Sequence, residues 1–249
     1  MSMKKVFNYS PNFNHNKRNS KQIKFLIFHY TGMKNESTAI SKLTNIKSKV
    51  SSHYLIKNNG EIITFVPDLY IAWHAGISFW KNFEFLNKNS IGIEISNPGH
   101  NFDYKKFSKK QIKSILLLSK FLIKKYQILP ENILGHSDIA PNRKKDPGEK
   151  FPWEYLFKNK IGFWHNLDKK KLMKFRTLKV DNLEKKIFYK NILKIGYSEK
   201  NFKNSKLKII KRTKILTKAF QRRFRQELIN GIIDQECLII SKNLTEMLK

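Results

Sequence analysis

The chain has 249 residues, of which 40% are hydrophobic, 28% charged and 13% aromatic, a composition that excludes a disordered chain and a membrane bundle. The 50 Lys and Arg residues exceed the 19 Asp and Glu residues by 31, and such a surplus suggests a polyanionic partner. The surplus is spread, however: residues 1–166 carry +16 and residues 167–249 carry +15. Because a nucleic-acid binder concentrates its charge in a stripe or patch, we predict no specific nucleic-acid partner.

The sequence carries no recognisable export or membrane signal. Residues 1–20 are polar and rich in Asn, without the apolar core of a signal peptide. The apolar stretch from Ile115 to Ile123 is interrupted by Lys120 and is shorter than the ~20 residues that span a bilayer. The default expectation is therefore a cytoplasmic protein, with the periplasm or cell envelope as the alternative.

The single cysteine, Cys237, cannot form an intramolecular disulfide. Nothing in the pattern indicates an oligomeric state.

The first part of the chain predicts a strand, a helix and a hairpin. Phe25–Phe28 is a short apolar run that fits a buried strand, and it ends at His29. Residues 36–48 carry apolar side chains at three- and four-residue steps, which indicates a weak amphipathic helix. Residues 52–57 and 61–65 flank an Asn-Asn-Gly turn and therefore predict a hairpin.

A further strand and a long helix follow. Residues 91–95 alternate in a β-rich run, which places Glu94 on the face opposite its isoleucine neighbours. Ser108 and Gln111 form a capping box at the start of an apolar-periodic run that continues to Tyr126.

Residues 133–135 form a second short apolar run that ends at a histidine, His136. Beyond it, closely spaced helix-breaking residues preclude regular structure: Pro141, Pro147, Gly148 and Pro152. Strands that alternate with helices up to about residue 150 predict an α/β fold with a mixed central β-sheet flanked by helices.

After Trp164 the pattern becomes helical. A basic linker is followed by three helical stretches, near residues 181–195, 211–226 and 236–248. This last region is close to the lower size limit for a self-supporting core. We predict one domain over residues 1–166, a linker over 167–180 and a small helical domain over 181–249.

Two histidines and an aspartate are candidate metal ligands. His29 and His136 each follow a short apolar run, so one sheet would present both at one edge. Asp146 lies ten residues beyond His136. Two imidazoles and one carboxylate would leave the fourth position of a zinc ion open for water, as in catalytic zinc sites. Asp138 is nearer to His136 and could instead be the ligand, an outer partner of the ligands, or a turn residue.

Each candidate also has a purely structural interpretation. A lone histidine at a strand end is more often a hydrogen-bonded structural group than a ligand. Glu94 could pair with a lysine, Arg143 and Lys144 could be solvated surface charges, and Trp73 and His74 could be ordinary packing residues.

Seven stretches in a fixed order weigh against those structural interpretations. They are Phe28–Met33, Val50–Ile56, Ala72–Gly76, Ser90–Gly99, Gly135–Pro141, Asp146–Gly148 and Phe151–Trp153. Together they resemble the zinc-dependent N-acetylmuramoyl-L-alanine amidases of the type that includes phage amidases and peptidoglycan recognition proteins. The resemblance runs from about residue 7 to residue 165.

The resemblance implies a mixed sheet flanked by helices, with one Zn²⁺ held by His29, His136 and Asp146. Some members of the family use Cys as the third ligand, so Asp146 places this chain in the branch that uses Asp. Glu94 matches the family's catalytic glutamate, and Lys144 matches its catalytic lysine. His53, Trp73 and His74 match positions that line the substrate groove.

The implied reaction is hydrolysis of the amide between N-acetylmuramic acid and L-alanine of the stem peptide, in cell-wall turnover or muropeptide recycling. The implied substrate is thus peptidoglycan or a muropeptide. The alternative is a catalytically silent peptidoglycan-recognition protein on the same fold. The complete set of ligands and catalytic residues favours the enzyme, because silent relatives typically lose ligands.

The C-terminal region carries a second resemblance. Ala219–Arg225, followed by Gly231–Asp234, resembles the three-helix peptidoglycan-binding domain that is often joined to these amidases. The loop over residues 198–206 lacks the acidic, Gly-rich turn usual in that domain. Phe220 and Phe224, four residues apart, would be core residues on one helix face.

Overall fold

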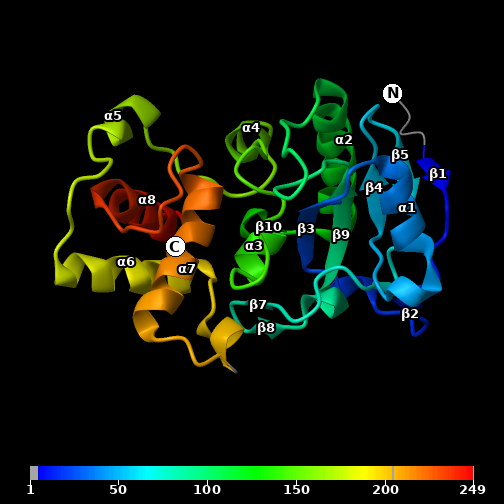
Figure 1. The fold of residues 1–249 in the computed structure, drawn as a ribbon, viewed down its shortest axis with the longest axis horizontal. Coiled ribbons are helices and arrows are strands. Elements are labelled where there is room, and N and C mark those ends of the chain that lie inside the picture. The colour runs from blue at the N-terminus through cyan, green and yellow to red at the C-terminus, as the bar shows by residue number, and fades with distance from the viewer. Residues whose placement is uncertain (1–4, 204, 249) are drawn as a thin grey trace.

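The computed structural model describes residues 5–203 and 205–248, and a six-stranded sheet lies at its centre (Figure 1). The strand order is β1-β5-β4-β9-β3-β10. The strands are β1 (Lys5–Phe7), β3 (Phe25–Tyr30), β4 (Tyr54–Ile56), β5 (Ile62–Thr64), β9 (Ser90–Ile95) and β10 (Ile133–Gly135). All neighbours run parallel except β4 and β5, which are antiparallel. The expected mixed sheet is therefore confirmed.

Local signals in the sequence explain several of these elements. The predicted hairpin is β4–β5, and Gly60 in its turn has a φ of +84°, which a residue without a Cβ adopts most readily. Two small antiparallel pairs were not anticipated, because each of their strands has only two residues. They are β2 (Phe13–Asn14) with β6 (Ile71–Ala72), and β7 (Phe79–Trp80) with β8 (Phe83–Glu84).

Helices α1 (Glu36–Thr44) and α2 (Lys109–Tyr126) pack on opposite faces of the sheet. Leu43 of α1 belongs to the apolar cluster around Leu55 of β4, whereas α2 belongs to the main core that contains Ile56. The Ser108 capping box at the start of α2 is present as predicted. Helix α1 ends four residues earlier than expected, and a short 3₁₀ turn takes over at residues 46–48.

The expectation of irregular structure after His136 was wrong in part. The one-turn helix α3 (His136–Ile139) begins at the histidine itself, and α4 (Trp153–Lys158) begins directly after Pro152. A proline is compatible with a helix start because the first N–H groups of a helix have no partner within it. The predicted linker also contains a helix, α5 (Lys169–Met173), which is capped by Asp168. Other 3₁₀ turns occupy residues 20–22, 86–89, 130–132 and 199–202.

The three predicted C-terminal helices are α6 (Asn182–Ile195), α7 (Ile209–Phe224) and α8 (Gln235–Glu246). We call residues 181–248 the helical module. It lies beside the β10 edge of the sheet (Figure 1), and its apolar side chains continue the main core. The rings of Phe224 and Trp164 have centroids 5.6 Å apart, and those of Tyr197 and Trp80 are 5.0 Å apart. No helix within the described residues is long and apolar enough to cross a membrane.

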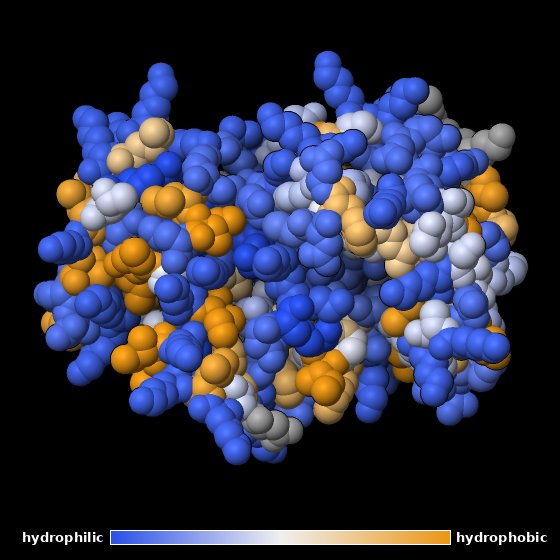
Figure 2. Space-filling model, in the orientation of Figure 1, coloured by the Kyte–Doolittle hydropathy of each residue, from blue (hydrophilic) through white to orange (hydrophobic). Residues whose placement is uncertain are grey.

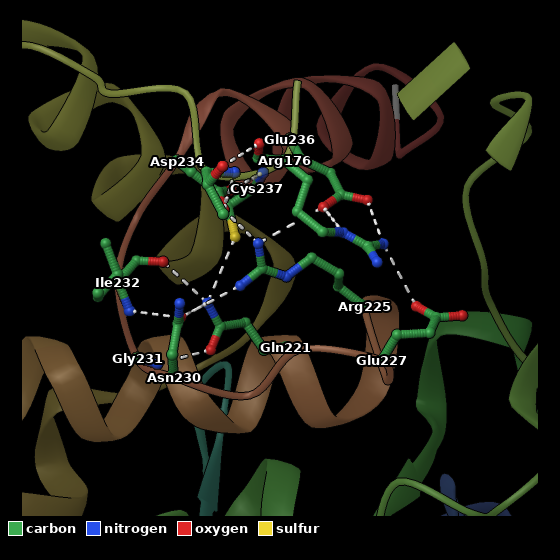
Figure 3. A network of polar contacts seen from close by, with 11 residues as sticks. Arg176, Gln221, Arg225, Glu227, Asn230, Gly231, Ile232, Asp234, Glu236 and Cys237 are labelled. Carbon is green, nitrogen blue, oxygen red and sulfur yellow. Dashed lines mark hydrogen bonds and ion pairs between the residues drawn. The ribbon is translucent and has the colours of Figure 1, made fainter. Parts of the chain in front are cut away.

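A buried polar network stabilises the module from within (Figure 3). Arg225 is 1% exposed and forms ion pairs with Asp234 and Glu236, and Arg176 also pairs with Glu236. Gln221 of α7 accepts a hydrogen bond from the N–H of Gly231. These contacts join the segment before α6, the end of α7 and the start of α8 into one unit.

Candidate metal centre and active-site cleft

Three side chains that are distant in sequence converge at one end of β3 and β10. His29 lies in β3, His136 is the first residue of α3, and Asp146 lies in the loop that follows. The Oδ2 atom of Asp146 is 3.0 Å from the Nδ1 atoms of both histidines, and these two Nδ1 atoms are 2.9 Å apart. All three side chains are buried. The structure thus brings together the three predicted metal ligands.

The second nitrogen of each imidazole has its own partner. Nε2 of His136 donates to the carbonyl oxygen of Ala75 at 3.1 Å. Nε2 of His29 lies 3.0 Å from Nδ1 of His74, and Nε2 of His74 lies 3.1 Å from the hydroxyl of Ser90. Since that hydroxyl itself donates to the Leu86 carbonyl, His74 donates to Ser90 and accepts from His29. Both candidate ligand histidines are therefore held in the tautomer whose Nδ1 lone pair faces Asp146.

The ionisation states suit a divalent cation. Burial, together with the nearby His136, lowers the pKa of His29 to about 4. Burial also lowers the pKa of His136. Burial by itself would raise the pKa of Asp146, but the contacts with His136 and His29 outweigh it and hold that pKa well below its usual range. Two neutral imidazoles and one carboxylate are a donor set that zinc prefers, so the residues fit this metal.

Gly92 makes room for this arrangement. A Cβ atom at position 92 of β9 would lie 2.4 Å from Cγ of His74. Only glycine therefore allows the His74 ring to lie against the strand and reach His29. This glycine is a feature that the sequence pattern left unexplained.

Glu94 lies on β9 directly opposite His29 of β3 and lines the adjoining cleft. Burial, together with the negative charge of Asp146, raises its pKa to about 8. Its Oε2 atom is buried and has no hydrogen-bond partner among the described residues. A carboxyl group with a pKa near neutrality can both accept and return a proton at working pH.

The cleft next to the three ligands has a volume of about 410 Å³. Trp73, His74 and Lys144 line it, as predicted, but so do residues that the sequence analysis did not select: Lys42, His100, Arg143 and Lys145. Arg143, which the sequence allowed to be a solvated charge, donates to the carbonyl oxygen of Ile77. His100 carries no sequence signal beyond its position after the Pro98-Gly99 turn.

The structure does not bring His53 into the cleft. This side chain is fully buried: Nδ1 accepts a hydrogen bond from the N–H of Gly92 at 3.0 Å, and Nε2 donates to the carbonyl of Tyr70 at 3.1 Å. The expectation that His53 contacts substrate is therefore corrected, because both of its nitrogens are used to hold the backbone. His74 lines the cleft but is almost buried, and its visible contacts orient His29.

Comparisons with known proteins agree with this geometry. The family model described as N-acetylmuramoyl-L-alanine amidase matches residues 19–149. The N-acetylmuramoyl-L-alanine amidase AmiD of Escherichia coli is 34% identical over 237 residues, which cover 90% of this chain and 83% of AmiD. The 1,6-anhydro-N-acetylmuramyl-L-alanine amidase AmpD of the same species is 40% identical over 105 residues, or 42% of this chain and 55% of AmpD.

Two solved structures match over most of the chain. The complex of AmiD with anhydro-N-acetylmuramic acid-L-Ala-D-γ-Glu-L-Lys has a TM-score of 0.77 and covers 91% of this chain and 90% of its own. AmpDh3 of Pseudomonas aeruginosa, in complex with an anhydromuramic pentapeptide, is 28% identical with a TM-score of 0.78, and covers 96% of this chain and 97% of its own. Since the family model spans more than half of the residues and AmiD aligns along nine-tenths of them, this chain belongs to the N-acetylmuramoyl-L-alanine amidase family.

Proposed function

We propose that the chain hydrolyses the amide between the lactyl group of N-acetylmuramic acid and L-alanine, with soluble anhydro-muropeptides as its preferred substrates. The observation that carries this proposal is the convergence of His29, His136 and Asp146 beside the unpartnered carboxyl group of Glu94. The form of the substrate is supported by AmiD and AmpDh3, which were both solved with anhydromuramyl peptides.

Each residue then has a defined task. His29 Nδ1, His136 Nδ1 and Asp146 Oδ2 would hold zinc, which when bound supplies a water of lowered pKa and polarises the amide carbonyl. Glu94 takes a proton from the attacking water and returns it to the leaving nitrogen, as general base and then general acid. The Lys144 ammonium stabilises the oxyanion of the tetrahedral intermediate from the wall of the cleft.

Other cations of the cleft would bind the stem peptide. Lys42, Arg143 and Lys145 line the cleft, whose acidic groups are Glu94 and Asp146. Stem peptides carry free carboxylates, which form charge-assisted hydrogen bonds with lysine and arginine. A positively charged rim therefore orients the peptide while the amide lies at the ligands.

Mass spectrometry of protein incubated with disaccharide-peptide fragments tests the activity. We expect free stem peptide with zinc and none after chelation, because the attacking water depends on the metal. Soluble anhydro-muropeptides and intact sacculi should be offered in parallel, and faster cleavage of the soluble form is expected. Absence of cleavage of either substrate, with zinc bound, would instead support the silent recognition protein. Faster cleavage of sacculi would indicate wall turnover in the envelope.

We also propose that the helical module holds wall glycan in an open groove of about 800 Å³ between α6 and α7. Its apolar lining suits the C–H faces of sugar rings, and includes Tyr189, Leu193, Ile209, Ile210, Ile232 and Ile233. Tyr189 lines this groove, and its hydroxyl is buried without a partner among the described residues, so the ring is the part of this side chain available to a sugar. Apolar patches lie over the module among hydrophilic areas in Figure 2.

Replacing Tyr189 by alanine should weaken retention on insoluble peptidoglycan about tenfold, since an aromatic ring of the groove lining is lost. Co-sedimentation with purified sacculi measures this, and cleavage of soluble fragments should stay within twofold of the wild type. Tyr155→Ala is a matched control, because Tyr155 is 50% exposed on α4, outside the groove. Equal retention of the Tyr189 variant and the wild type would exclude this groove as the glycan site.

A further inference from the structure

An ion pair buried between the helical module and the sheet lies close to the metal ligands. Nη1 of Arg223, near the end of α7, donates to Oδ2 of Asp138 in α3 at 2.8 Å. The two side chains are 3% and 1% exposed. The same guanidinium stacks over the ring of Trp153, 4.0 Å from its centroid, and its Nη2 atom donates to the carbonyl of Ile133 in β10 at 2.9 Å.

Asp138 in turn holds the short helix that presents His136. Its Oδ2 atom accepts the N–H of Gly135, the residue before His136, at 2.8 Å. Its Oδ1 atom accepts the hydroxyl of Tyr197, which also belongs to the helical module, at 2.9 Å. A helix of one turn has little stability of its own, so α3 depends on such contacts.

The segment held in this way also reaches the third ligand. The N–H of Ser137, which follows His136, donates to the backbone carbonyl of Asp146 at 2.8 Å. Arg223 and Tyr197 thus hold the two carboxylate oxygens of Asp138. Asp138 in turn binds the N–H of Gly135, where α3 begins, and α3 binds the backbone of Asp146 through Ser137.

We propose that Arg223 is a positioning residue for the amidase site: the helical module sets the placement of His136 and Asp146 through the buried Arg223–Asp138 pair. The proposal rests on the metal site of the proposed function. It gives the module a role in the catalytic reaction itself, separate from any binding of glycan. The planar guanidinium of arginine donates to Asp138 and to the Ile133 carbonyl at the same time, and its face stacks on the ring of Trp153. The ammonium group of a lysine cannot make this combination of contacts.

The experiment compares Arg223→Lys with Arg225→Lys. Arg225 lies two residues further along the chain, is equally buried and forms ion pairs. Its side-chain partners Asp234, Glu236 and Asn230, however, lie within the module (Figure 3). Both lysine variants keep the charge and should lower the melting temperature. Zinc affinity is measured on metal-free protein by competition with a chelator, at a temperature where circular dichroism shows each variant to be folded. Values of kcat and KM are then measured with saturating zinc.

For Arg223→Lys we expect a zinc affinity about tenfold weaker, the lower end of the cost of losing a direct partner of a metal ligand, because Arg223 acts on the ligands through Asp138. Its kcat should fall by a similar factor while KM stays within twofold. For Arg225→Lys both zinc affinity and kcat should stay within twofold of the wild type. Zinc affinity unchanged in Arg223→Lys, or weakened equally in both variants, would overturn the positioning role. A wild-type protein that binds no zinc would overturn the metal site itself.

Tyr197→Phe keeps the proposal testable where Arg223→Lys fails to fold. This change removes only the hydroxyl that donates to Asp138 and leaves the ring against Trp80. A weakening of zinc affinity by about threefold is expected, and an affinity equal to that of the wild type would count against the role of Asp138 as the link.

Discussion

Glu94→Gln is expected to leave zinc bound and to lower kcat on soluble muropeptides by about 10³-fold, within the range usual for loss of a general acid–base group. Glutamine has the shape of glutamate but cannot take the proton of the attacking water. Single-turnover kinetics together with metal analysis of the purified variant measure both parts of this expectation. A variant that retains zinc and turns over at the wild-type rate would remove Glu94 from the mechanism.

The same variant tests the electrostatics of Glu94 independently of turnover. In metal-free protein the pKa of Glu94 is raised from 4.5 to about 8, chiefly by burial. A raised pKa of an acid means that folding is favoured while the group is protonated and that this contribution is lost as pH rises from 4.5 towards 8. Glutamine has no such loss. Metal-free Glu94→Gln should therefore gain several degrees in melting temperature over the wild type at pH 8, and less at pH 5; an equal difference at both pH values would contradict the buried carboxyl.

Asp146→Asn is expected to weaken zinc affinity by roughly 100-fold or more, because a neutral amide replaces the one anionic ligand and outer partners alone are worth 10- to 100-fold. Amidase activity should be undetectable when zinc is equimolar with the protein. Chelator competition gives the affinity, and activity measured against zinc concentration shows how much returns.

The exposed Asp103 provides the control for this change. Asp103→Asn removes a carboxylate whose ion pair within the described residues is with the solvent-exposed Lys105, so zinc affinity and activity should not change. Tight zinc binding by Asp146→Asn would show that Asp146 is not the third ligand, and Asp138 would then have to be considered again.

Much of the fold follows from local patterns. The capping box at Ser108, the turn at Gly60 and the apolar run at Phe25 each produced the element expected of them, because the signals act over a few neighbouring residues. Helix α3 was missed because its single turn carries no periodic signal. It forms where Asp138 accepts the N–H of Gly135 and is itself held by residues far along the chain.

The candidate catalytic residues fall into the same two groups. The motifs around His29, Glu94 and Lys144 indicated a zinc amidase before any geometry was known, because they resemble that family in residue type and order. The burial that raises the pKa of Glu94, and the fully buried position of His53, depend on which side chains surround them in space. Neither the raised pKa of Glu94 nor the burial of His53 can be predicted from the residues next to it in the sequence.

Asp138 and Asp146 show most clearly what each level determines. Spacing along the chain left both as candidate ligands, because each lies within ten residues of His136. In the folded protein, Oδ2 of Asp146 lies 3.0 Å from both ligand histidines, whereas Asp138 is turned to Gly135, Tyr197 and Arg223. From residue type and order, the family, the sheet and the kinds of side chain at the site could be predicted. Which carboxylate faces the two histidines became clear only in the folded protein, where Asp138 is bound by Arg223, 85 residues away in the helical module.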